Sequence, residues 1–387
     1  MTPIKSGYSE RPVLIVGGGP VGLLLALFLN ELGIECKVLE QKTEIDPHSK
    51  SIGIHPVSLE LLDELDLTGP FLKAGVKIRR GIAYSERGKI GTISFASCPP
   101  PHSYILSLPQ AQTEQILETR LGEVSPDCLV RGTVVSKVET NRDRPSVTAE
   151  QKSVSYHITA DYLIGCDGTN SLVRRSAGIP FTGKPYPDTY IMGDFSDETG
   201  FGRDAVVYLH PDGLVESFPL PGGMRRWVVK TDSYIQSFKR EQIEELVRQR
   251  TGYPLNGTEN RMLSSFGVQH YLAEPLCRDR IILAGDAAHV VSPIGGQGMN
   301  LGWLGAWDLA HALKKVLSRS GPPDHQLRKW SVRTKIRARK AARRAELNMW
   351  LGRKHRSPLL RKAIAWGMTH PPLEKKAARI FTMRDLV

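Results

Sequence analysis

The chain has 387 residues, 40% of them hydrophobic and 24% charged, which is enough to bury a large core in more than one lobe. The longest apolar run, residues 21–29, is too short to span a bilayer and belongs to an expected helix, so we expect neither a membrane span nor a signal peptide. Five scattered cysteines without metal-ligand spacing predict no disulfide framework and no metal site, and they favour the cytoplasm.

The N-terminal stretch predicts a strand, a tight turn and a helix. Apolar residues 12–16 lead into the glycines of a G-x-G-x-x-G pattern, which are Gly17, Gly19 and Gly22. In such a pattern the first glycine permits the turn, the second admits a phosphate and the third lets the helix pack closely. A helix-period segment follows over 23–32, and a strand over 35–39 delivers Glu40, where an acid can bind a ribose hydroxyl pair. The arrangement predicts a dinucleotide site without separating NAD from FAD.

The next part of the chain mixes short strands and helices. We expect, in order, a polar connection over 42–58, a helix around 59–65, short strands within 76–104, a helix over 111–121 and an antiparallel meander over 127–160. His55 is interpreted as a loop or capping residue. A buried strand then ends in Asp167 and Gly168 and runs into a helix start near 169–175.

Residues 181–271 have the pattern of a separate, mostly antiparallel lobe. Strands are predicted over 188–195, 205–210, 213–220 and 225–230, with one helix over 239–251. The segment 210–213, His-Pro-Asp-Gly, favours a hairpin turn over a catalytic role.

A third glycine motif follows a buried strand at 280–284. Gly285 and Asp286 end that strand, and a loop leads into a helix over 301–318; the loop contains Pro293, Gly295, Gly296, Gly298, Met299 and Asn300. A carboxylate at the strand end can bind ribityl hydroxyls, and a positive helix end stabilises the negative charge of a reduced flavin. These motifs favour FAD; a glycine-rich helix start without a ligand is the alternative.

Together the three motifs resemble, in order and spacing, those of the single-component (group A) FAD-dependent aromatic hydroxylases, the family of para-hydroxybenzoate hydroxylase and the ubiquinone-biosynthesis hydroxylases. The middle motif is Cys166-Asp167-Gly168 with Ser171 and Arg174. The resemblance covers residues 10–365. It implies an α/β fold with a Rossmann-like FAD lobe, an antiparallel-sheet substrate lobe and a C-terminal helical segment; the implied ranges are 1–75, 105–180 and 275–330, then 76–104 and 181–274, then 331–387.

The resemblance also implies where the cofactor is anchored. Glu40 is expected to bind the adenosine ribose, Gln110 to lie near the ribityl chain and Asp286 to bind a ribityl hydroxyl. Lys50 stands where many relatives have an arginine, and lysine acts as a point charge without bidentate geometry. Cys166 stands where alanine is usual.

The reacting end is implied in the same way. Pro293, with Gly295 and Gly296, is expected near the flavin C4a, where oxygen reacts. NAD(P)H is expected as a transient co-substrate near Asp167 and Arg174. The remaining residues expected to bind the cofactor are Gly17, Gly19, Gly22, Gly168, Gly285, Gly298, Met299 and Asn300.

The implied function is an NAD(P)H- and O2-dependent monooxygenase. It would hydroxylate or epoxidise an aromatic, quinoid or polyketide-like small molecule through a flavin C4a-hydroperoxide. A reductase or other oxidoreductase of the same superfamily, and a non-enzymatic binding protein on the same fold, are the alternatives. No thioredoxin-like extension is expected.

The net charge of +12 is concentrated near the C-terminus, where residues 321–387 hold 18 Lys and Arg against 4 Asp and Glu. A basic helical segment of this kind can contact a membrane or an acidic partner. It lacks interleaved aromatic residues, so we expect no nucleic-acid binding. A solvated helix that clamps the FAD lobe is the favoured interpretation.

Overall fold

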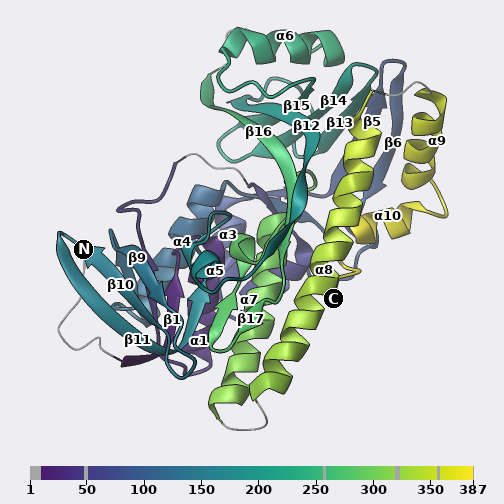
Figure 1. The fold of residues 1–387 in the computed structure, drawn as a ribbon. Coiled ribbons are helices and arrows are strands. Elements are labelled where there is room, and N and C mark those ends of the chain that lie inside the picture. Colours follow the sequence, from purple (N-terminus) through teal and green to yellow (C-terminus); the bar gives the residue numbers. More distant parts are fainter. Residues whose placement is uncertain (1–9, 48–50, 256–258, 319–322, 355–357, 387) are drawn as a thin grey trace.

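The computed structural model describes residues 10–47, 51–255, 259–318, 323–354 and 358–386. Two eight-stranded sheets form the two lobes (Figure 1), and the described residues contain a further three-stranded sheet. The small sheet consists of β3 (Gly53–Ile54), β7 (Ile105–Ser107) and β4 (Val76–Ile78). No helix among the described residues is both long and apolar enough to cross a membrane.

The first sheet has a parallel core in the strand order β18-β11-β1-β2-β8. Its strands are β1 (Glu10–Val16), β2 (Cys36–Glu40), β8 (Leu129–Arg131), β11 (Val154–Gly165) and β18 (Ile281–Leu283). Antiparallel strands β9 (Val134–Glu139), β10 (Ser146–Gln151) and β17 (Cys277–Arg278) extend it. Because crossover helices cover parallel strands, their apolar residues are buried on both faces.

The predicted meander over 127–160 is wrong in one respect. Its first strand, β8, runs parallel to β2 and not antiparallel to its successor. The last strand is longer than expected: β11 pairs antiparallel with β10 over its first half and parallel with β1 and β18 over its second half.

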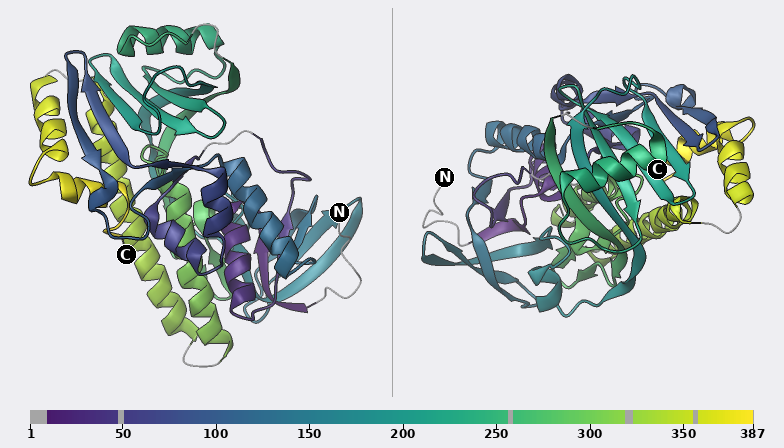
Figure 2. Two further views of the ribbon diagram at one scale, coloured as in Figure 1. Left: turned by 180° about the vertical axis from the view of Figure 1, so that it is seen from behind. Right: turned by 90° about the horizontal axis from the view of Figure 1, so that it is seen from above.

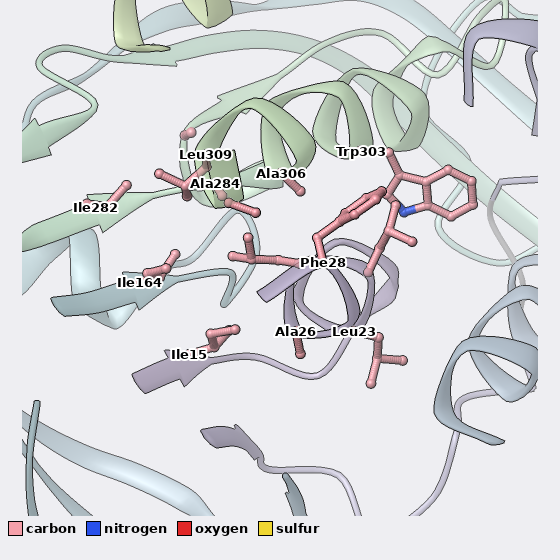
Figure 3. Packing of buried hydrophobic residues seen from close by; sticks show 14 of the residues in the cluster. Ile15, Leu23, Ala26, Phe28, Ile164, Ile282, Ala284, Trp303, Ala306 and Leu309 are labelled. Carbon is pink, nitrogen blue, oxygen red and sulfur yellow. The ribbon is translucent and has the colours of Figure 1, made fainter. Parts of the chain in front are cut away.

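The core of this lobe lies between the parallel sheet and two helices, α1 (Pro20–Glu31) and α7 (Gln297–Leu317). Figure 3 shows Phe28 of α1 and Trp303 of α7 in this core, which also contains Ile15, Ile164 and Ile282 from three neighbouring strands. The Trp303 and Phe71 rings form a T-shaped contact with a centroid distance of 6.3 Å, and the Trp303 indole N–H donates to the Pro20 carbonyl. The remaining helices of the lobe are α2 (Pro56–Asp63), α3 (Thr68–Ala74), α4 (Gln110–Val124) and α5 (Leu172–Ser176).

The second sheet has the order β19-β16-β12-β15-β14-β13-β5-β6, antiparallel except where β13 meets β5. Its strands are β5 (Arg80–Ser85), β6 (Gly88–Ser94), β12 (Phe181–Ser196), β13 (Ala205–His210), β14 (Gly213–Leu220), β15 (Met224–Thr231), β16 (Asn260–Ala273) and β19 (His289–Val290). The long strands β12 and β16 run side by side from one lobe to the other (Figure 1). Helix α6 (Arg240–Thr251) covers the outer face. The expected hairpin turn at 210–213 joins β13 to β14.

Three helices end the chain: α8 (Pro323–Gly352), α9 (Pro358–Thr369) and α10 (Glu374–Phe381). Helix α8 packs along α7 and reaches the second sheet, while α9 and α10 pack on β6 (Figures 1 and 2). The expected boundary at residue 331 therefore falls inside one unbroken helix. Many basic side chains of this segment form ion pairs within the chain; they include Arg333, Lys335, Arg337, Arg339, Arg344, Arg353, Lys354, Lys362 and Arg384.

Candidate functional site

A cavity of about 1150 Å³, here called the central cavity, lies between the two lobes. At one end it is lined by the glycine turn after β1 and by Glu40. At the other end it is lined by the inner face of the second sheet and by residues of α8, α9 and α10. Residues from both lobes and from the C-terminal helices thus line one continuous space.

The turn between β1 and α1 requires glycine for two separate reasons. Gly17 has φ +106°, and a Cβ there would lie 2.4 Å from the Cys166 carbonyl oxygen. A Cβ on Gly22 would lie 2.0 Å from the Gly17 carbonyl oxygen, so only glycine allows α1 to pack this close to the turn. Around Gly19, by contrast, a Cβ would meet nothing within 4 Å. Gly17 and Gly19 line the central cavity, whereas Gly22 supports the turn from behind.

The N-terminus of α1 faces the cavity without a side-chain cap, because its N-cap residue is Gly19. Its free N–H groups and positive dipole end suit a diphosphate. Glu40 lines the same end, and its carboxylate accepts hydrogen bonds from the backbone N–H of Gly18 at 2.6 Å and of Lys42 at 2.8 Å. These bonds fix the carboxylate beside the glycine turn. Lys50 lies outside the described residues.

The late glycine motif forms the middle of the cavity. Gly285 and Asp286 lie in a short 3-10 turn after β18, and both line the cavity. Gln110, at the start of α4, lines it as well, and its amide donates to Glu114 at 2.8 Å. Asp286 and Gln110 are thus brought to one space from positions far apart in the sequence.

Helix α7 begins at Gln297, four residues before the predicted start. Gly298, Met299 and Asn300 therefore lie in its first turn and not in the loop. The N-cap is Gly296, with φ +65° and no side-chain cap, so a second uncapped helix N-terminus meets the cavity. Pro293, Gly295, Gly298 and Met299 line the cavity around it.

Asn300 does not line the cavity but holds the loops that do. Its amide donates to the carbonyls of Gly53 and Gly296, each at 2.8 Å, and its oxygen accepts from the His55 backbone N–H at 2.8 Å. The His55 ring lines the cavity, and its Nε2 lies 3.2 Å from the Gly295 carbonyl oxygen. Burial lowers the pKa of His55 to about 4, so the ring is neutral and Nε2–H donates to that carbonyl. Sequence reasoning missed this contact, because residues 55 and 295 are brought together only by the fold.

The structure places only part of the middle motif at the central cavity. Asp167 and Gly168 line the cavity, and the Asp167 carboxylate accepts from the Val173 backbone N–H at 3.0 Å. Its second oxygen is buried and has no partner among the described residues.

Arg174 is not brought to the cavity. Its guanidinium lies 3.8 Å from the centroid of the Phe181 ring and donates to the carbonyls of Ala287 at 3.0 Å and Thr169 at 2.7 Å. The neighbouring Arg175 lines the cavity instead. Arg174 thus supports the middle motif and the Gly285–Ala287 turn from behind.

The residues present fit FAD. Two uncapped helix N-termini, an open position at Gly19, and carboxylates at Glu40 and Asp286 are the donors and acceptors that a diphosphate, a ribose and a ribityl chain need. Among the described residues no group of three or more His, Cys, Asp or Glu could hold a metal ion.

Comparison with known proteins gives the same picture. The chain is 32% identical over 328 residues to a 12-dehydrotetracycline 5-monooxygenase/anhydrotetracycline 6-monooxygenase of Streptomyces rimosus, covering 81% of this chain and 64% of that protein. It is 31% identical over 313 residues to a rifampicin monooxygenase of Streptomyces venezuelae, covering 78% and 63%. The chain therefore spans less than two thirds of the length of these curated relatives.

Solved structures confirm the predicted α/β fold. The p-nitrophenol 4-monooxygenase of Pseudomonas putida superposes with a TM-score of 0.87 at 22% identity, over 97% of this chain and 98% of that one. An anhydrotetracycline hydroxylase of Streptomyces rimosus gives a TM-score of 0.81 at 29% identity, over 97% of this chain and 76% of that one.

The sequence and structure comparisons together confirm the predicted resemblance to FAD-dependent aromatic hydroxylases. The family described as FAD binding domain matches residues 10–345, and the chain belongs to this family.

Proposed function

We propose that the protein is an FAD-dependent monooxygenase that uses NAD(P)H and O2 to hydroxylate an aromatic or polyketide-like small molecule. The observation that carries the proposal is the central cavity, which joins a dinucleotide cradle to an apolar sheet face in one space. The names of the relatives, which act on tetracycline intermediates and rifampicin, support the same class of substrate.

Each end of the cavity has its own task. Glu40, Gly17, Gly19 and the N-terminus of α1 would hold the adenosine diphosphate half of FAD, and Asp286 with the N-terminus of α7 would hold the flavin half. Bound FAD would supply the exchange of electrons with NAD(P)H and the activation of O2. NAD(P)H would approach transiently near Asp167 and Arg175.

The inner sheet face would receive the substrate. Its lining side chains are mostly apolar, among them Met192, Val228, Val207 and Phe266. Such a surface stacks on a fused ring system and excludes water from the reacting atoms.

The C-terminal helices complete the enclosure in this proposal. Because α8 packs along α7 and four of its arginines, Arg333, Arg337, Arg339 and Arg344, form ion pairs within the chain, we propose a clamp between the lobes. The cytoplasm is proposed as the compartment, supported by five cysteines, none of which forms a disulfide in the described part of the chain.

The test is a labelled turnover experiment. Purified protein should be yellow and release FAD on acid precipitation, and it should oxidise NADH or NADPH faster when an aromatic substrate is present. With ¹⁸O₂ the product should gain one heavy oxygen atom. NAD(P)H oxidation without oxygen transfer would favour the reductase alternative, and a colourless protein that cannot be reconstituted with FAD would favour a binding protein.

A further inference from the structure

We propose that Glu216 selects the substrate: it binds a hydroxyl group of a neutral polycyclic ligand in the central cavity and disfavours ligands that carry a carboxylate. The inference rests on the proposed function, because it places the substrate on the inner face of the second sheet. It adds a specificity-determining residue that none of the glycine motifs contains.

Strand register puts Glu216 in the middle of an apolar wall. On β14 it is paired directly with Val207 of β13 and Val228 of β15. The row continues across the sheet and lines the central cavity throughout, through Ala83, Val207, Glu216, Val228 and Met192. On the same strand, Leu214 and Phe218 line the cavity two residues to either side. Glu216 is therefore the one charged member of this row.

The Glu216 carboxyl has no hydrogen-bond or ion-pair partner among residues 10–47, 51–255, 259–318, 323–354 and 358–386. An unpartnered carboxyl in apolar surroundings is costly, so its presence in a binding cavity indicates that a ligand supplies the partner. Burial in this wall raises the pKa of Glu216 to about 7. Near neutral pH the ionised form of the Glu216 carboxyl is populated, and it can accept a hydrogen bond from a ligand hydroxyl.

The nearby cations on this sheet face are already committed. In the adjacent row, Arg226 donates to both oxygens of Asp194, at 2.6 and 2.8 Å. In the row on the other side, Lys230 lies 3.6 Å from Asp188, which also binds Arg353, the residue directly after α8. A carboxylate ligand would thus meet the charge of Glu216 without a free cation on the described part of this face to receive it.

A second polar group nearby also lacks a partner. The Tyr190 hydroxyl is buried with no hydrogen-bond partner among the described residues. Burial raises the pKa of Tyr190, and the charge of Glu216 raises it further, so the two groups share one electrostatic environment. The Tyr190 ring stacks on Phe266, which lines the cavity, at a centroid distance of 5.4 Å. Helices α8 and α9 contribute the uncharged Asn348 and Thr369 to the lining of the same cavity.

The test compares three ligands with one ring skeleton: 2-naphthol, 2-methoxynaphthalene and 2-naphthoate. Binding to the purified full-length protein is measured by isothermal titration calorimetry without NAD(P)H, so no turnover occurs. The expected result is that 2-naphthol binds at least tenfold more tightly than each of the other two, which corresponds to about 1.4 kcal/mol.

Variants connect this preference to the residue. E216L should abolish the preference for 2-naphthol over 2-methoxynaphthalene, and E216Q should reduce the discrimination against 2-naphthoate. D212N, which removes an exposed carboxyl from the turn between β13 and β14, should change neither ratio. Melting temperature and flavin content confirm that each variant is folded; if E216L fails to fold, E216Q carries the comparison.

Equal ratios in the unchanged protein and the Glu216 variants would overturn the inference, as would the absence of 2-naphthol binding. The outcome is distinguishable from that of the proposed function. A protein that transfers oxygen but shows no Glu216-dependent preference refutes this inference alone. A protein that shows the preference but transfers no oxygen refutes the proposed function alone.

Discussion

The carboxyl of Glu216 couples the stability of the fold to pH. Its pKa is raised by burial from 4.5 to about 7, so between these values the folded chain binds more protons than the unfolded chain. The contribution of this carboxyl to the free energy of unfolding is therefore fully present below pH 4.5 and is lost as the pH rises through 7. E216Q removes this titration, so we expect it to be more stable than the parent at pH 8, by on the order of 1–3 kcal/mol, relative to their difference at pH 5. Urea unfolding at the two pH values measures this; parallel pH profiles for parent and variant would contradict it.

Two glycines of the N-terminal turn make a matched pair. A methyl group on Gly22 would collide with the Gly17 carbonyl, whereas Gly19 is extended and open. We expect G22A to lower the melting temperature of cofactor-free protein. G19A should leave that temperature unchanged and weaken FAD binding at least tenfold, because the methyl occupies the space proposed for the diphosphate. Thermal unfolding and fluorescence titration separate the two effects. Equal melting temperatures for both variants would show that helix packing does not require Gly22.

Residues of the site differ in how readily the sequence predicts them. Gly17 and Gly285 can be predicted because each belongs to a motif whose residues are neighbours in the sequence. His55 and Glu216 do not, because their partners and neighbours come from other strands and helices. At the middle motif the sequence favoured Arg174, yet the turn of α5 places Arg175 at the cavity. A sequence motif does not show which of two adjacent helical residues lies at a cavity.

Helices and strands also differ in whether the local sequence pattern is enough to predict them. The glycine turn and the buried strands of the first sheet follow from periodicity, and they were predicted. Strand β16 was not, because it is polar at many positions, and the eight-residue helix α10 was expected only as an unspecified part of the helical segment over 331–387. The start of α7 was placed too late, because glycine suggested a loop where it instead forms the first turn of the helix.

One buried carboxylate forms ion pairs between α7 and α8. Asp308 on α7 accepts hydrogen bonds from Arg333 and Arg337 of α8, and both Asp308 and Arg337 are buried. D308N leaves the Arg337 charge uncompensated, so we expect a loss of about 3–5 kcal/mol in the free energy of unfolding. The control is E274Q: Glu274 pairs with Lys335 and Arg339 of the same helix but is half exposed, so the loss should stay below about 1 kcal/mol. Similar losses in urea unfolding for both variants would contradict the assignment.

At the scale of the whole molecule, the C-terminal helices contribute to two different parts of the central cavity. Helix α8 supports α7, whose N-terminus meets the middle of the cavity. Helices α9 and α10 instead close the end formed by the second sheet, through Ala365, Met368, Thr369 and Phe381. The two parts of the segment should therefore be separable by truncation.

Removal of residues 358–387 should spare FAD and expose the substrate end. We expect this shorter protein to remain yellow with a lowered melting temperature, and to bind 2-naphthol at least tenfold more weakly, because apolar wall is lost where the ligand would lie. Removal of residues 323–387 also takes away α8 and uncovers α7, so FAD should then be lost as well. Flavin content after gel filtration and calorimetric titration with 2-naphthol measure the two effects independently. If the shorter truncation already loses FAD, the helices act as one clamp and the cavity does not divide its tasks; if the longer one retains FAD and substrate binding, α8 is not a clamp.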